Sequence, residues 1–323
     1  MRHALLTGGT GFIGSHLAEH LLGRGMMVTA LVRDPAKLRF LDGSGVRILR
    51  GDVHNVPDLP RDLDVVFHLA GLTKALQVKD YYSVNREGTA NLLDALAGRM
   101  APPRFVYLSS NAAAGPSPAG RPRRESDPPR PVSVYGQSKL GGENETLCRK
   151  DVLPVAVVRV GGVFGPRDTD FLDYFKFVRY GVLPIFGRKR RPMTVCYVRD
   201  LVRALVAVAL ADRPSGEVYN IGDPRPCTID DLGRMVAQSL GVRVKPVVIP
   251  LGVVFAAVVF EEKRAGLRKK PAVLDRGKFA QYLHPSWVAD VDKARTTLGF
   301  ETAVPLEEGI KETIAWYRRT GWL

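Results

Sequence analysis

Close to its start the chain contains Ala4-Leu5-Leu6-Thr7-Gly8-Gly9-Thr10-Gly11-Phe12-Ile13-Gly14, a short apolar run that breaks into a cluster of glycines. A helical pattern of apolar residues follows at once, at positions 17, 18, 21 and 22. Strand, tight turn and helix in this order is the setting in which a G-x-G-x-x-G spacing indicates a dinucleotide site. Gly9, Gly11 and Gly14 satisfy that spacing, and Gly8, Gly11 and Gly14 satisfy a G-x-x-G-x-x-G spacing.

Residues without a Cβ suit this turn because the backbone must approach a pyrophosphate closely and the helix must pack tightly on the strand. The free N–H groups at the start of the helix, together with its dipole, then hold the anion. We therefore expect the turn to bind a nicotinamide dinucleotide through Gly8, Thr10, Gly11, Phe12, Ile13 and Gly14.

Further buried strands recur along the chain, separated by helical segments. The expected strands are 27–32, 46–53, 64–71, 104–110, 154–159 and 218–221. Strands that alternate with helices at this spacing predict an α/β protein with a doubly wound parallel sheet of the Rossmann type. We expect residues 1–165 to form the NAD(P)-binding domain. Residues 166–323 should form a smaller substrate-binding lobe, with some segments returning to the main sheet.

The second strand should carry the residue that distinguishes NADP from NAD. It ends in Arg33-Asp34-Pro35, and an arginine here accommodates a 2′-phosphate whereas a carboxylate binds the ribose hydroxyl. Because Arg33 directly follows the apolar run, we expect it to face the adenosine pocket with help from Lys37, which favours NADP. The alternative is that Asp34 binds NAD and Arg33 is solvated.

Strand ends in the first half supply further expected cofactor contacts. Asp52 and Val53 should lie beside the adenine, and Leu69, Ala70 and Gly71 should let the backbone approach the cofactor. His68 lies between apolar residues, so a structural role is favoured over a chemical one.

Tyr135 and Lys139 are four residues apart on an expected helix, so their side chains share one face. Ser110 ends the strand that precedes this helix. Because the carboxyl ends of parallel strands open onto the ligand crevice, these three side chains can converge on a nicotinamide.

With these motifs in place, the chain resembles the extended short-chain dehydrogenase/reductase family, also described as the NAD(P)-dependent epimerase/dehydratase family, over essentially its whole length. The resemblance rests on the glycine turn, on Tyr135-Gly136-Gln137-Ser138-Lys139, on Val198-Arg199-Asp200 and on Trp287-Val288-Ala289-Asp290. It implies that Tyr135 is the general acid/base and that Ser110 binds the substrate oxygen. Lys139 would bind the ribose hydroxyls and favour the phenolate of Tyr135. We also expect Val160 and Val163 to line the cofactor site.

Two positions depart from the sugar-nucleotide enzymes of that family. Many of those enzymes carry an asparagine where this chain has Gly162 and an arginine where it has Met193. The stretch 157–166 looks more like the 3β-hydroxysteroid dehydrogenase and dihydroflavonol 4-reductase branch. The resemblance thus favours an NADP-dependent oxidoreductase for a hydrophobic secondary alcohol or ketone, sterol-, flavonoid- or lipid-like. The alternatives are a sugar-nucleotide epimerase, dehydratase or reductase with tightly held NAD(P), and a cofactor-binding protein without turnover.

Composition limits the partners. The chain has 323 residues, a net charge of +14 and three cysteines without metal-ligand spacing, so we expect no metal site and a reducing, cytoplasmic location. The first residues predict no signal peptide, and no apolar run is long enough for a membrane span. The basic clusters 188–191 and 263–270 are compatible with phosphate binding, weak peripheral membrane contact or plain solvation. We expect a small-molecule substrate, no nucleic acid and a homodimer.

Overall fold

A computed structural model describes residues 1–269, 271–272 and 275–323. Its main sheet has seven parallel strands in the order β10-β6-β5-β4-β1-β2-β3. The strands are β1 (His3–Thr7), β2 (Met27–Val32), β3 (Arg47–Arg50), β4 (Val65–His68), β5 (Arg104–Leu108), β6 (Val155–Val160) and β10 (Glu217–Ile221). The expected α/β fold of the Rossmann type is confirmed.

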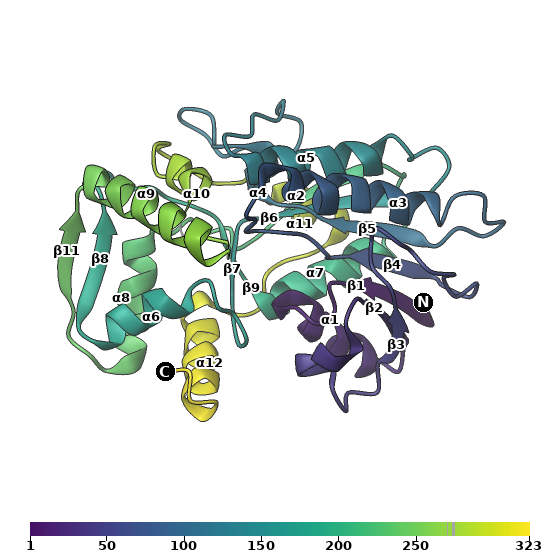
Figure 1. Cartoon of the computed structure of the whole chain (residues 1–323), viewed down its shortest axis with the longest axis horizontal. Helices are drawn as coiled ribbons and strands as arrows, with labels where there is room; N and C mark the ends of the chain where they lie inside the picture. Colours follow the sequence, from purple (N-terminus) through teal and green to yellow (C-terminus); the bar gives the residue numbers. More distant parts are fainter. Residues whose placement is uncertain (270, 273–274) are drawn as a thin grey trace.

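Helices cover both faces of this sheet (Figure 1). One face carries α1 (Phe12–Leu22) and α7 (Val198–Leu210). The other carries α2 (Val78–Tyr82), the π-helical turn η3 (Ser83–Glu87), α3 (Gly88–Asp94), α4 (Asn111–Ala114) and α5 (Val134–Leu147). The helical stretch 78–94 is therefore divided into three short consecutive segments.

Alternating side chains of the strands fill both layers. Leu6 and Phe67 are fully buried beneath α1 and α7, whereas their neighbours Leu5 and Val66 are fully buried in the opposite layer. A parallel sheet that is covered on both faces needs apolar residues at successive positions, which explains the uninterrupted apolar runs of the sequence.

The remaining elements form the second lobe, which has its own core. It contains the small parallel pairs β7–β9 and β8–β11. Its strands are β7 (Gly162–Phe164), β8 (Val182–Phe186), β9 (Val195–Tyr197) and β11 (Lys245–Ile249). Its helices are α6 (Leu172–Arg179), α8 (Ile229–Leu240), α9 (Leu251–Arg268), α10 (Arg276–Gln281) and α12 (Leu306–Arg319). The helix α11 (Asp292–Leu298) instead packs on β10 and joins the core of the main sheet. Because β10 joins the main sheet, residues after 165 contribute to it, and the domain boundary at 165 stays a prediction.

Asp200 lies in the first turn of α7 and is not its N-terminal cap. That helix starts at Val198, with Tyr197 in the capping position. The buried carboxylate of Asp200 instead accepts hydrogen bonds from the backbone N–H groups of Ala303 and Val304, at 3.0 and 3.1 Å. It therefore ties α7 to the segment that leads into α12.

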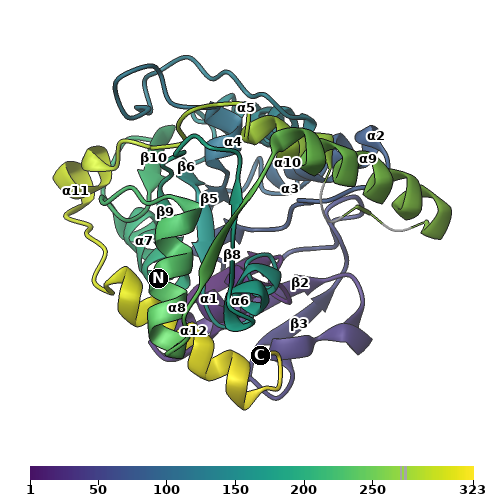
Figure 2. The ribbon, with the colours of Figure 1, turned by 90° about the vertical axis from the view of Figure 1, so that its left-hand side faces the viewer.

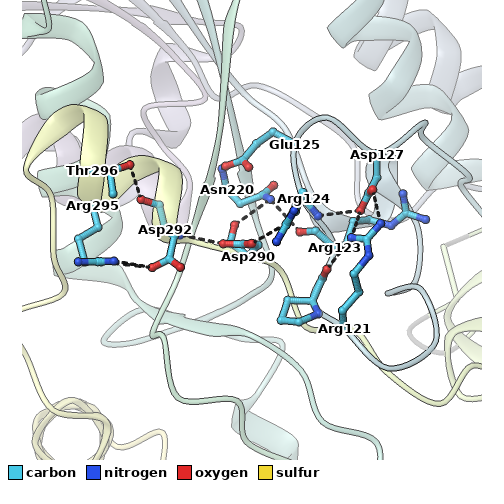
Figure 3. Close-up of polar contacts among 11 residues, drawn as sticks. Arg121, Arg123, Arg124, Glu125, Asp127, Asn220, Asp290, Asp292, Arg295 and Thr296 are labelled. Carbon is cyan, nitrogen blue, oxygen red and sulfur yellow. Dashed lines mark hydrogen bonds and ion pairs between the residues drawn. The ribbon is translucent and has the colours of Figure 1, made fainter.

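The segment 112–131 is not simply a solvated loop. Its start belongs to the short helix α4, and Arg123 is only 6% exposed because its side chain donates to the carbonyl oxygens of Pro116 and Pro128. Figure 3 shows the neighbouring contacts: Arg121 pairs with Asp127, and Arg124 pairs with Asp290. The backbone of Arg123 also pairs with that of Ala289, so this arginine-rich segment holds the later segment 287–290 beside it.

The apolar run 247–260 is divided between two elements, β11 and α9, at Pro250. In the part of the chain that the structure describes, no helix has the length and apolar character needed to span a membrane.

Candidate active site

The sheet's carboxyl edge opens into a cleft between the two lobes, with a volume of about 1050 Å³. The glycine turn, the ends of β4, β5 and β6, and the start of α5 form its inner wall. The segment 168–171, β8 and α10 form its outer wall. The glycine turn, the strand ends and the start of α5, which the sequence indicated separately, therefore all face one cleft.

The glycine turn has the geometry that a dinucleotide requires. Gly8 has a φ of +71°, and a Cβ on it would lie 2.8 Å from the backbone nitrogen of Ala70. A Cβ on Gly14 would overlap the carbonyl oxygen of Gly8. Gly8, Gly11 and Gly14 line the cleft, so the G-x-x-G-x-x-G spacing describes the turn, and the residues fit a bound pyrophosphate at the start of α1.

The other expected cofactor residues divide into two groups. Those that line the cleft are Phe12, Ile13, Leu69, Gly71, Val160 and Val163. Those outside its lining are Thr10, Arg33, Asp52, Val53 and Ala70. Within the second group, the Ala70 N–H donates to Thr7 Oγ1, Asp52 accepts from the N–H groups of His54 and Asn55, and Val53 is buried. Their cofactor roles stay predictions.

In the charged loop after β2, the arginine that lines the cleft is not the one that the sequence suggested. Arg33 is exposed, and the Asp34 carboxylate pairs with Lys37 and caps the turn at Ala36. Arg39, which has a φ of +55°, lines the cleft next to the glycine turn. L-residues rarely adopt this backbone conformation, so the sequence pattern did not indicate that Arg39 would lie in the cleft.

Ser110 and Tyr135 meet in the cleft. Both side chains line the cleft, and Ser110 Oγ accepts a hydrogen bond from the Ala112 N–H at 3.1 Å. Burial raises the pKa of Tyr135 above its usual value, the Ser110 side chain opposes this, and the Asp170 carboxylate adds to it. Without a cofactor, Tyr135 is therefore a protonated phenol at neutral pH, placed to donate a proton.

Lys139 lies one helical turn after Tyr135, deep in the same wall. Its Nζ donates to the Leu108 carbonyl oxygen at 2.7 Å and lies 4.1 Å from the centre of the Tyr107 ring. Burial lowers the pKa of Lys139 to about 7, and the Glu143 carboxylate opposes this shift. Without a cofactor, burial dominates the pKa of both groups, so the expectation that Lys139 favours the phenolate stays a prediction.

An ion pair that the sequence analysis missed supports this wall from behind. Glu143 and Arg159 are both buried and joined by bonds of 2.9 and 2.6 Å, and the Ser109 hydroxyl donates to Glu143 at 2.5 Å. Glu143 lies four residues beyond Lys139 on α5, so the Y-x-x-x-K-x-x-x-E spacing was a usable signal.

Two more missed residues lie beside Tyr135. Asp170 lines the cleft and accepts a 2.6 Å hydrogen bond from Lys74, which belongs to the loop after β4, so this ion pair crosses the cleft. Asn111 also lines the cleft, is 8% exposed, and has no hydrogen-bond partner for either side-chain polar atom among the described residues. Asp170 belongs to no local spacing pattern, because tertiary packing brings it there, whereas Asn111 directly follows Ser110 in the sequence.

His68 has the structural surroundings that its sequence context favoured. It is fully buried between the hydroxyls of Thr7 and Thr89, at 2.6 and 2.9 Å. Burial and, to a smaller extent, Lys139 lower its pKa to about 3, so it stays neutral.

Comparison with known proteins extends this description. A family model described as "NAD dependent epimerase/dehydratase family" matches residues 4–222. The chain is 28% identical to a ceramide reductase of Caulobacter vibrioides, over 98% of this chain and 95% of that protein. It is 28% identical to a 3β-hydroxysteroid dehydrogenase/isomerase of Mycobacterium tuberculosis, over 97% and 90%.

Among solved structures, the UDP-glucuronic acid 4-epimerase of Bacillus cereus in complex with NAD superposes with a TM-score of 0.79 at 25% identity, covering 98% of this chain and 99% of that one. Most of the other similar solved structures also have titles that name UDP-sugars. The matches therefore do not single out the steroid and flavonoid branch. The family match itself covers the sheet and its glycine turn, and the chain belongs to the NAD-dependent epimerase/dehydratase family.

Proposed function

We propose that this protein is an NAD(P)-dependent oxidoreductase that interconverts a secondary alcohol and a ketone. The observation that carries the proposal is the convergence of Ser110, Tyr135 and Lys139 in the cleft that also contains the glycine turn. When bound there, the nicotinamide would accept or supply the hydride.

Each of the three side chains has a distinct role in this proposal. Ser110 orients the substrate oxygen by a hydrogen bond. Tyr135 gives its proton to that oxygen during ketone reduction and takes it back during alcohol oxidation; its raised pKa suits donation at neutral pH. Lys139, held by the Leu108 carbonyl, offers its remaining donors to the ribose hydroxyls.

For the substrate, the lining of the cleft favours an apolar molecule. Gly162 lies against the Phe171 ring, and the lining also includes Ile185, Met193 and Trp287. Arg191, one of the arginines of the lining, already donates to the carbonyl oxygens of Phe186, Lys189 and Tyr282. The names of the ceramide reductase and the steroid dehydrogenase among the relatives agree with this substrate class.

A sugar nucleotide is the second candidate, and the comparisons with solved structures favour it over the apolar class. One structural observation also supports it: Lys189 lines the cleft and, among the described residues, has no carboxylate partner. Its ammonium could bind a substrate diphosphate. An enzyme of this kind would keep its cofactor bound through a redox cycle.

Two measurements on the purified protein separate the candidates. Retained NAD(P) together with binding of UDP-sugars would support the sugar-nucleotide class. Exchangeable cofactor, together with NAD(P)H oxidation in the presence of sterol-, flavonoid- or long-chain lipid-like ketones, would support the apolar class. The preference for NADP rests on Arg33, with help from Lys37, and on the resemblance to the reductases. The similar solved structures with a named cofactor contain NAD, so both cofactors belong in the assay.

A further inference from the structure

The helix α9 rests on the protein by an unusually narrow face. Of its 18 residues only Val254, Val258 and Ala265 are buried. These three lie on one side of the helix, since their spacing is close to whole turns. Most of the helix surface therefore points away from the body of the protein, and Figure 2 shows α9 at the edge of the molecule, next to α10.

An apolar row runs along the outward side of α9. Val253, Phe260 and Leu267 follow one another at intervals of seven residues, and they are 57%, 69% and 87% exposed. Seven residues make almost two helical turns, so the three side chains lie in one line, which we name the α9 stripe. Single exposed apolar residues need no explanation, but an aligned set on one helix marks an interaction surface.

Positive charge flanks the α9 stripe. Lys263, Arg268 and Lys269 are exposed and, within the described part of the chain, have no carboxylate partner. The two glutamates of α9 are already paired, Glu261 with Arg264 and Glu262 with Arg276. Lys270, the last residue of this basic cluster, lies outside the described residues. The surface thus combines an apolar row with an uncompensated cationic edge.

This surface adjoins the mouth of the cleft. Glu262 of α9 and Arg276 of α10 both line the cleft. Pro271, just beyond α9, lines a second hollow together with Leu76, which is 48% exposed. The end of α9 therefore reaches from the second lobe to the loop after β4, and the exposed Val78 extends the apolar rim there.

We propose that α9 is a membrane-docking helix, whose stripe lies in the headgroup region of an anionic bilayer and whose cations bind the lipid phosphates. An amphipathic helix with an apolar row beside lysine and arginine is suited to this position in the interface. The unpaired cations favour an anionic lipid surface over a second copy of this basic chain, since two copies would bring like charges together. The inference stands on this surface alone and is independent of the substrate assignment.

Vesicle sedimentation with the full chain tests the proposal. We expect the wild-type protein to sediment with vesicles of phosphatidylcholine and phosphatidylglycerol, but not with phosphatidylcholine alone. The triple variant Val253→Ser, Phe260→Ser, Leu267→Ser should bind at least about tenfold more weakly, which corresponds to about 1.4 kcal/mol. A second variant, Lys263→Gln, Arg268→Gln, Lys269→Gln, should lose its dependence on anionic lipid.

A matched control replaces three exposed apolar residues outside α9, two in loops before strands and one at the end of α7: Met100→Ser, Val152→Ser and Leu210→Ser. This control should bind vesicles like the wild type. Wild-type protein that ignores anionic vesicles, or a stripe variant that binds them normally, would overturn the proposal. The proposal would also be overturned if the stripe variant bound vesicles normally but differed from the wild type in its molecular mass in sedimentation velocity. In that case α9 would cover a second copy of the chain. Tryptophan emission of a Phe260→Trp variant gives an independent readout, with a blue shift expected only with anionic vesicles.

Discussion

The ammonium group of Lys139 donates a 2.7 Å hydrogen bond to the carbonyl oxygen of Leu108, the last residue of β5. This bond fixes the catalytic helix to the end of the strand that carries Ser110. The lysine is thus in position before any ligand arrives, at the expense of burying its charge.

The buried charge of Lys139 should make stability depend on pH. Because its pKa falls to about 7 in the folded state, the unfolded chain binds more protons above that pH, so wild-type stability should increase from about pH 7 to about pH 9. Lys139→Met should remove this rise in the free energy of unfolding, which amounts to at most about 2 kcal/mol. Denaturant unfolding of both proteins across this range measures it, and parallel pH profiles would contradict the assignment.

Tyr135→Phe should abolish turnover while leaving cofactor affinity nearly unchanged. The ring remains and only the proton donor is lost, and the loss of a positioned acid typically lowers kcat by about 10²- to 10⁴-fold. Cofactor titration and steady-state rates on the same preparation provide the comparison. Activity within a few-fold of wild type would exclude Tyr135 as the acid.

Asp170→Asn should lower the pKa of Tyr135. The Asp170 carboxylate is one of the groups that raises it, so its removal should shift the pH–rate profile downward by about one unit or less. Asp173→Asn, an exposed carboxylate in the adjacent helix, is the matched control and should leave the profile in place. An unshifted profile in Asp170→Asn would mean that its charge is compensated by Lys74.

Arg33→Ala and Arg39→Ala should separate the two candidates for a 2′-phosphate contact. If Arg33 makes the contact, its removal should erase a preference for NADP of about one to two decades and leave NAD binding almost unchanged. If Arg39, which lines the cleft, makes it, only the second variant should do so. Titration of both cofactors at fixed ionic strength decides the matter, and a wild-type preference for NAD would exclude both.

Breaking the buried pair of Glu143 and Arg159 should destabilise the protein strongly. Arg159→Met leaves the Glu143 carboxylate buried and unpaired, which typically costs about 3–5 kcal/mol. The double variant with Glu143→Gln should recover part of that loss. Chemical denaturation of the three proteins gives the comparison, and equal stability of the single variant and wild type would show that water reaches Glu143.

The parts of this protein that sequence analysis predicted depend on local spacing. The glycine turn, the strands and the pair of Tyr135 and Lys139 follow from patterns within a few residues, so the fold and the centre of the site were accessible. Asn111 directly follows Ser110, whereas Asp170 and the buried Arg123 reach their positions through contacts with distant segments. No short-range pattern encodes such contacts, and Asp200 shows the same limit, because its partners lie more than 100 residues later.

The place of β10 at the edge of the main sheet has a consequence for engineering. The family match ends at residue 222, one residue after this strand, and α7 and β10 reach the sheet only after the chain has passed through β7, β8 and β9. A chimera that exchanges everything after residue 165 would therefore replace an edge strand and a covering helix along with the specificity-bearing lobe. Grafting a new specificity onto this scaffold requires two separate inserts, with residues 195–221 retained from the recipient.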